Sequence, residues 1–297
     1  MNGKKITAAL ILILAVAALI YGSLLGAAPL SYDDDQNIFA NSYFINGHLA
    51  ALWVQPYYGM FVPATSTVWA ALLSLGSGAA WPFRLLNLSL HLANAVLVFI
   101  LLRGFLRRIG IESGFALVIG VAVFALHPLQ VGAVAWLSGA RDLLAAFWAL
   151  SALAVFFRFR NKRGSLVSIA LFALAILSKP NVVTLPVAAA FLLWLVREPI
   201  TTRVRATLGA WLALSLAAVT WTYLTQDEVM VATHSGFLSR FIVMSDTFGF
   251  HLMKIALPLG LAVDYGRTPA TVLASTPMWV TTTIVVADPE PGRVEEK

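Results

Sequence analysis

Residues 6–30 read ITAALILILAVAALIYGSLLGAAPL and contain no charged side chain. A helix needs about 20 apolar residues to cross a hydrocarbon core of ~30 Å, so this stretch predicts a membrane span. Lys4 and Lys5 precede it, as in a signal peptide, but the apolar part of a signal peptide has only about 7–15 residues. We therefore expect an uncleaved first span whose amino terminus lies in the cytoplasm.

The composition of the whole chain also indicates a membrane protein. Of the 297 residues, 60% are hydrophobic and 11% are charged, and the mean hydropathy is +0.84. Soluble domains carry about 25% charged residues, and disordered chains have low hydrophobicity, so both classes are excluded. The chain has no cysteine, which excludes disulfides, thiolate metal sites and cysteine nucleophiles.

Other apolar stretches predict further spans at about 83–103, 114–128, 142–157, 165–179, 182–196, 206–224 and 272–287. The stretch 241–261 is apolar but contains Asp246, His251 and Lys254, so we expect an interfacial or re-entrant segment there. The expected fold class is an all-α polytopic membrane protein with about eight transmembrane helices, within a range of about seven to nine. In the first outer loop, 31–82, the stretches 38–53 and 60–75 predict interfacial helices.

Charged residues between these stretches alternate in sign. Twelve of the 20 basic residues fall on one side: Lys4, Lys5, Arg103, Arg107, Arg108, Arg158, Arg160, Lys162, Arg163, Arg197, Arg203 and Arg205. Six acidic residues fall on the other: Asp33, Asp34, Asp35, Asp142, Asp227 and Glu228. By the positive-inside rule the basic side is cytoplasmic. We expect a multi-pass protein of a prokaryotic plasma membrane or a eukaryotic endoplasmic reticulum, and the net charge of +6 needs no nucleic-acid partner.

Three adjacent carboxylates, Asp33, Asp34 and Asp35, directly follow the first span. Such a group suits a general base or a cation site, whereas a solvated acidic loop is the alternative interpretation. We favour a functional role because the acids begin a loop that otherwise follows the membrane surface.

Arg84, Asn87, His91 and Asn94 recur at intervals of three and four, which places them on one face of the second predicted span. Polar groups in hydrocarbon usually face the interior of a helix bundle. Two roles stay open for them: hydrogen bonds between helices, or contact with a ligand.

The connection 126–143 contains Pro128, which is expected to end a helix, and Gly139, which allows a tight turn. Arg141 beside Asp142 predicts a charge pair that either holds a phosphate or is a plain surface ion pair. Lys179 is either an interfacial anchor or a second phosphate ligand.

Motifs for nucleotides, dinucleotides and zinc are absent from the sequence, and none of the five histidines pairs with another at metal-ligand spacing. We expect no cofactor and no metal site, although the three acids could hold a divalent metal.

Several segments together resemble the transmembrane and tetratricopeptide-repeat O-mannosyltransferases. Residues 32–41, YDDDQNIFAN, resemble their aromatic-Asp-Asp-x-x-x-Ile-x-x-Asn segment, and residues 87–94, NLSLHLAN, are similar to their Asn-x-x-x-His-x-x-Asn span. His127-Pro128 with Val134, Gly139, Asp142, Leu143 and Leu144 matches their His-Pro to Gly-x-x-Asp-Leu-Leu stretch. Lys179, Arg240 and Asp264-Tyr265 stand at later markers, and the order agrees across about 30–265.

This resemblance implies a GT-C class membrane glycosyltransferase. Such enzymes move a sugar from a polyprenyl-phosphate donor to a protein hydroxyl or another acceptor at the outer face of the membrane. The family's catalytic base maps onto Asp33 and Asp34, and Asp35 falls on a variable position. The resemblance assigns donor-phosphate or substrate contacts to Arg141, Lys179, Arg240, His91, Asn94, His127, Asp142, Asp264 and Tyr265.

The chain departs from the family pattern at three places. Gly132 and Pro180 replace two of the family's glutamates, and Ala140 replaces an arginine, with Arg141 displaced by one. Tetratricopeptide repeats are absent, so we expect a GT-C-like domain over 1–287 and a truncated or frameshifted polar tail over 288–297. A non-catalytic relative that binds a lipid-linked sugar or scaffolds a partner is the alternative. A flippase or transporter is less favoured, because its ionisable residues would lie at mid-span.

Overall fold

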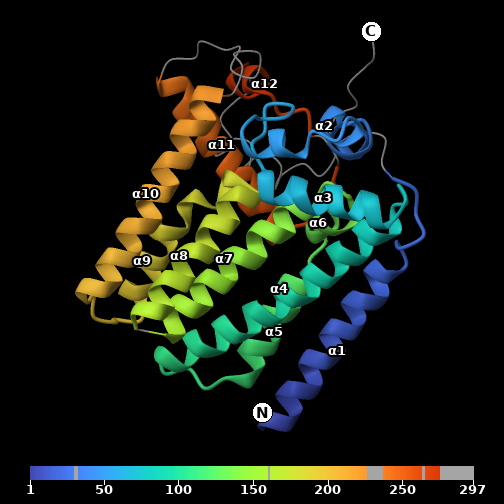
Figure 1. Cartoon of the computed structure of the whole chain (residues 1–297). Helices are drawn as coiled ribbons and strands as arrows, with labels where there is room; N and C mark the ends of the chain where they lie inside the picture. Colours follow the sequence, from blue (N-terminus) through green and yellow to red (C-terminus); the bar gives the residue numbers. More distant parts are fainter. Residues whose placement is uncertain (30–32, 160, 226–236, 263–264, 275–297) are drawn as a thin grey trace. The chain divides into compact units, whose positions relative to one another are not determined.

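The computed structural model describes residues 1–29, 33–159, 161–225, 237–262 and 265–274, and these form helices joined by turns and loops, with no β-strand among them (Figure 1). The chain divides into two compact units, Met1–Gln226 and Asp227–Lys297. Each unit is described by itself.

The first unit contains all the helices that precede Asp227. They are α1 (Gly3–Gly22), η1 (Asp35–Phe39), α2 (Ser42–Ile45), η2 (Leu49–Trp53), α3 (Pro63–Leu75), α4 (Trp81–Arg108), α5 (Gly114–Leu126), α6 (Gln130–Ala135), α7 (Ala140–Arg158), α8 (Lys162–Ser178), η3 (Pro180–Thr184), α9 (Leu185–Leu195) and α10 (Thr202–Thr225). The described part of the second unit contains α11 (Phe237–Ala256) and α12 (Pro269–Ala274).

Four of these helices, α1, α4, α7 and α10, are long and apolar enough to cross a membrane. Helix α5 and the segment 180–195 are apolar but shorter. An all-helical fold with helices that could span a membrane is therefore confirmed for the described residues, whereas about eight spans stays a prediction. The predicted span 272–287 lies almost wholly outside the described residues.

Two predicted elements have different bounds in the structure. Helix α1 ends at Gly22 and turns follow it, because Gly26 and Pro29 disfavour a longer helix. The helix predicted over 38–53 is divided into η1, α2 and η2. Asn41 separates the first two by accepting a hydrogen bond from the Tyr43 backbone N–H at 3.0 Å, and Gly47 interrupts the chain at a φ of 69°.

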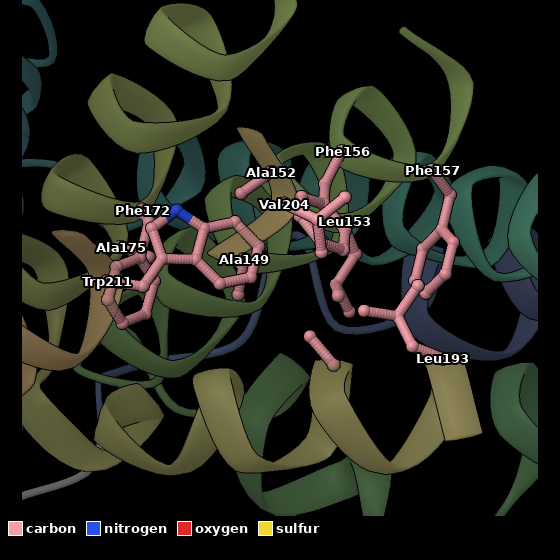
Figure 2. Close-up of a cluster of buried hydrophobic side chains, with 11 residues drawn as sticks. Ala149, Ala152, Leu153, Phe156, Phe157, Phe172, Ala175, Leu193, Val204 and Trp211 are labelled. Atoms are coloured by element: carbon pink, nitrogen blue, oxygen red, sulfur yellow. The ribbon is translucent and has the colours of Figure 1, made fainter. Parts of the chain in front are cut away.

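Helix α7 is the centre of the first unit, with α4 on one side and α8 on the other (Figure 1). Figure 2 shows the apolar cluster that α7 forms with α8, α9 and α10. The buried Trp211 ring lies 5.2 Å from Phe156 and 5.1 Å from Phe172. Fully buried small residues, among them Ala152 and Ala175, let neighbouring backbones approach closely, as membrane helices do.

The two ends of the first unit differ in charge. The amino terminus and the connections α4–α5, α7–α8 and α9–α10 lie together at one end, whereas α2, α3 and α6 lie at the other, the loop end (Figure 1). We call the first the basic end, after Arg103, Arg107, Arg108, Arg158, Lys162, Arg163, Arg197, Arg203 and Arg205. The ion pair of Arg108 with Glu198, at 2.8 Å, ties α4 to the α9–α10 connection there.

Candidate functional site

The segment 33–41 is fixed by its own asparagines. Asn37 Nδ2 donates to the Asp33 carbonyl at 2.8 Å, and Asn41 Nδ2 donates to the Asn37 carbonyl at 3.1 Å. Both amides are buried, and Ile38 packs fully buried in a cluster with Trp69 and Phe83. These contacts therefore fix the backbone that carries the Asp33 and Asp34 carboxylates.

Asp34 is fully buried and faces the connection between α6 and α7. Its carboxylate accepts backbone N–H groups of Ser138 at 2.9 Å and Leu137 at 3.3 Å. Hydrogen bonds to a charged acceptor are among the stronger ones in proteins. Asp34 therefore joins the first outer loop to the start of α7, and its catalytic role stays a prediction.

Asp33 is partly exposed and forms an ion pair with Arg141 at 2.9 Å. Arg141 belongs to the first turn of α7, and its other terminal nitrogen donates to the sulfur of Met60 at 3.0 Å. The Asp33 carboxylate is thus the member of the acidic triplet that meets a cation and remains open to solvent. Asp35 is exposed at the start of η1.

A second ion pair lies beside the first. Lys179, directly after α8, approaches Asp142 at 2.6 Å. The predicted pair between Arg141 and Asp142 does not form, because consecutive residues on a helix do not face each other. The structure instead brings Asp33, Arg141, Asp142 and Lys179 together in one set of alternating charge, which we call the charged row.

An apolar groove begins next to the charged row. It lies between α8 and α10, has a volume of about 220 Å³ and is lined by Phe61, Ile176, Leu177, Pro180, Leu214, Ala218 and Trp221, among others. Pro180 follows Lys179 of the charged row, and Phe61 follows Met60, whose sulfur Arg141 contacts, so two lining residues are chain neighbours of residues in or touching the charged row. No motif marks Phe61 or Trp221 in the sequence, since their only signal is membership of an apolar, aromatic stretch.

The polar face of α4 is buried and hydrogen-bonded to backbone carbonyls. Arg84 donates to Ala27, Ala28 and Ala135, at distances of 2.5–3.1 Å. Asn87 donates to the Trp136 carbonyl at 2.5 Å.

His91 and Asn94 continue this face. His91 Nε2 lies 2.9 Å from the Ala125 carbonyl, and Asn94 Nδ2 donates to the Leu143 carbonyl at 3.0 Å. A carbonyl only accepts, so Nε2 of His91 carries the proton. These contacts are the interhelical hydrogen bonds that were one of the two roles left open, and ligand contact by His91 and Asn94 stays a prediction.

The remaining predicted residues lie elsewhere. His127 follows α5, and its Nδ1 accepts the Leu129 backbone N–H at 3.2 Å. Arg240 is exposed in the first turn of α11, and Tyr265 packs against Phe250 with ring centroids 4.8 Å apart, both in the second unit. Asp264 lies outside the described residues. Within the first unit, the structure therefore gathers four of the predicted residues in the charged row.

Gly139 is required by close packing. Its φ of −62° is ordinary, but a Cβ there would lie 2.1 Å from the Ala133 carbonyl oxygen. Gly139→Ala is therefore expected to destabilise the protein by about 1–3 kcal/mol and to displace Ser138, which Asp34 contacts. The melting temperature of the purified protein in detergent measures this effect. Gly132→Ala is the matched control, because nothing lies within 4 Å of its Cβ. Equal melting temperatures of the two variants would contradict the role of Gly139.

No group of three or more histidine, aspartate or glutamate side chains in the described ranges is arranged to hold a metal ion. No protein-family model, curated protein or solved structure matches the chain. The resemblance to O-mannosyltransferases therefore stays a prediction. The features of the structure that bear on function are the charged row and the groove between α8 and α10.

Proposed function

We propose that this protein is a GT-C-like glycosyltransferase. In this proposal it moves a mannose-like hexose from a polyprenyl-phosphate donor to a hydroxyl of a protein or another acceptor at the outer face of the membrane. The observation that supports it best is the Asp33–Arg141 pair, a carboxylate and a cation at 2.9 Å, placed beside an apolar groove.

Asp33 serves as the general base. It removes the acceptor proton as the hydroxyl oxygen attacks the anomeric carbon, and the bond from that carbon to the phosphate oxygen breaks. Polyprenyl phosphate leaves with the bonding electrons, and the configuration at the anomeric carbon inverts. A phosphate is a competent leaving group, so one base with electrostatic stabilisation is sufficient.

Arg141 stabilises the leaving phosphate. Its guanidinium suits a phosphate geometrically, and its present partner is the Asp33 carboxylate. A donor phosphate that takes over Arg141 releases Asp33 to act as a base. In this proposal, Asp33 therefore becomes available as a base only after the donor has bound. Lys179, paired with Asp142, supplies a second cation in the same way.

The groove between α8 and α10 receives the first part of the polyprenyl chain. Its lining is almost wholly apolar, and Ala218 leaves space where a larger side chain would fill it. Since the chain comes from lipid, which is already apolar, the groove would hold it by van der Waals packing. The groove would hold the lipid while the charged row holds its phosphate.

The proposal is tested with a labelled polyprenyl-phosphate hexose and membranes containing the protein. Ala218→Phe fills the groove and is expected to raise the apparent KM for the donor about tenfold, an effect of ~1.4 kcal/mol, with little change in kcat. Ala188→Phe, on the exposed face of α9, is the matched control and should leave both parameters unchanged. If the wild-type protein transfers sugar from none of a panel of polyprenyl-phosphate hexoses, the proposal fails.

A binding protein without turnover is the second candidate. The observation that favours it is that Asp33 and Arg141 neutralise each other, as the members of a purely structural ion pair do. Saturable binding of the labelled donor with no transfer to any acceptor would support this candidate.

A further inference from the structure

A second apolar groove, larger than the one between α8 and α10, lies away from the charged row. It runs between α4, α7 and α9 near the basic end and has a volume of about 490 Å³, within the ~300–1,000 Å³ of known ligand sites. Its lining includes Leu101, Phe105, Leu150, Leu153, Phe157 and Leu192. Leu153 and Phe157 also belong to the cluster in Figure 2, so one wall of the groove is the packed core itself.

The groove exists because small residues stand where the helices would otherwise fill it. Gly104 on α4 and Ala154 on α7 have no side-chain atoms beyond Cβ, and both line the groove. Ile100 lines it too and is 51% exposed, so the groove is open on the outer face of α4. In a membrane protein, that face meets lipid tails.

One part of the groove is cationic, because Arg108 and Arg158 line it. Arg108 is held in place by Glu198 at 2.8 Å and by the carbonyl of Phe157 at 3.0 Å. Arg158 differs, since its guanidinium lies 5.6 Å from the Phe159 ring and pairs with no acidic side chain of the described residues. An exposed guanidinium beside an apolar groove matches a ligand with an apolar chain and an anionic head.

We propose that this groove binds an anionic phospholipid of the leaflet that adjoins the basic end. One acyl chain occupies the groove, and the lipid phosphate contacts Arg158. The exposed Arg158 guanidinium attracts an anionic head group and repels the cationic group of a zwitterionic lipid. The site lies at the opposite end of the first unit from the loop end, so it does not rest on the proposed transfer reaction (Figure 1).

Native mass spectrometry of the purified protein tests the site directly. The protein is mixed with phosphatidylglycerol and phosphatidylcholine of identical acyl chains, and the bound fractions are compared. We expect the wild-type protein to prefer phosphatidylglycerol. Arg158→Gln should lower that preference about fivefold, as one basic residue near an anionic surface does. Ala154→Phe fills the groove and should reduce the bound fraction of both lipids.

Two matched controls separate the groove from general effects. Arg163→Gln removes an exposed cation at the start of α8, and Ala170→Phe adds a ring on an exposed face of α8, and both should leave lipid binding unchanged. Equal binding of the two lipids by the wild-type protein overturns the proposal. So does an unchanged preference in Arg158→Gln, or displacement of phosphatidylglycerol by equimolar undecaprenyl phosphate, which would assign the groove to polyprenyl lipids. Unchanged melting temperatures of the variants verify that each is folded.

Discussion

Asp33→Asn lowers the rate of sugar transfer about 10²-fold or more and leaves the protein folded. The amide keeps the size of the carboxylate but cannot accept a proton from the acceptor hydroxyl, and general base catalysis contributes typically 10²–10⁴-fold. Asp33 is partly exposed, and within the described residues the hydrogen bond of its carboxylate comes from Arg141, so the substitution disturbs little packing. Transfer from a labelled polyprenyl-phosphate hexose measures the rate.

The neighbouring acids serve as controls for this result. Asp35→Asn changes an exposed residue and should transfer sugar at the wild-type rate. Asp34→Asn should lower both the transfer rate and the melting temperature, because the buried carboxylate accepts two backbone N–H groups. Transfer at the wild-type rate by Asp33→Asn would remove Asp33 from the role of base.

Arg84→Met destabilises the protein by about 3 kcal/mol or more. The change removes three hydrogen bonds from the buried Arg84 guanidinium, to the carbonyls of Ala27, Ala28 and Ala135, and a hydrogen bond to a charged group contributes about 1.5–3 kcal/mol where water does not replace it. The expected fall in melting temperature is roughly 6 °C or more. It is measured as the loss of monodisperse protein after heating in detergent.

Arg103→Met is the matched control on the same helix. Arg103 is exposed at the basic end, where its guanidinium lies 6.0 Å from the Phe99 ring, so its removal should change the melting temperature little. Equal effects of the two substitutions would show that the hydrogen bonds of Arg84 do not stabilise the fold.

Most helices could be predicted because each carries its own apolar run. Helix α4, for example, is apolar over two-thirds of its length and begins at Trp81-Pro82, a usual helix start. The division of 38–53 into three short helices was missed, since it depends on where the Asn41 side chain turns back onto the backbone. Hydrophobic periodicity carries no information on that choice.

The site could be predicted in part. The sequence pointed to Asp33, Arg141, Asp142 and Lys179 because charge is rare in this chain and therefore conspicuous. Their pairing was beyond reach, since Arg141 meets Asp33 across 108 residues of chain and Asp142 meets Lys179 across 37. Local sequence also could not separate Asp33 from Asp34, whose different exposures arise only when α7 packs against the first outer loop.

The hydrogen bonds of Asp34 can form only after a large part of the chain has been synthesised. Its two backbone donors follow it by 103 and 104 residues, so α1, α3, α4 and α5 are synthesised before either donor exists. Until then the Asp34 carboxylate lacks the two backbone donors that hold it in the folded protein. The charged row is therefore completed late, after α7 and then α8 have been synthesised, and a chain whose synthesis stops before Leu137 has no assembled site.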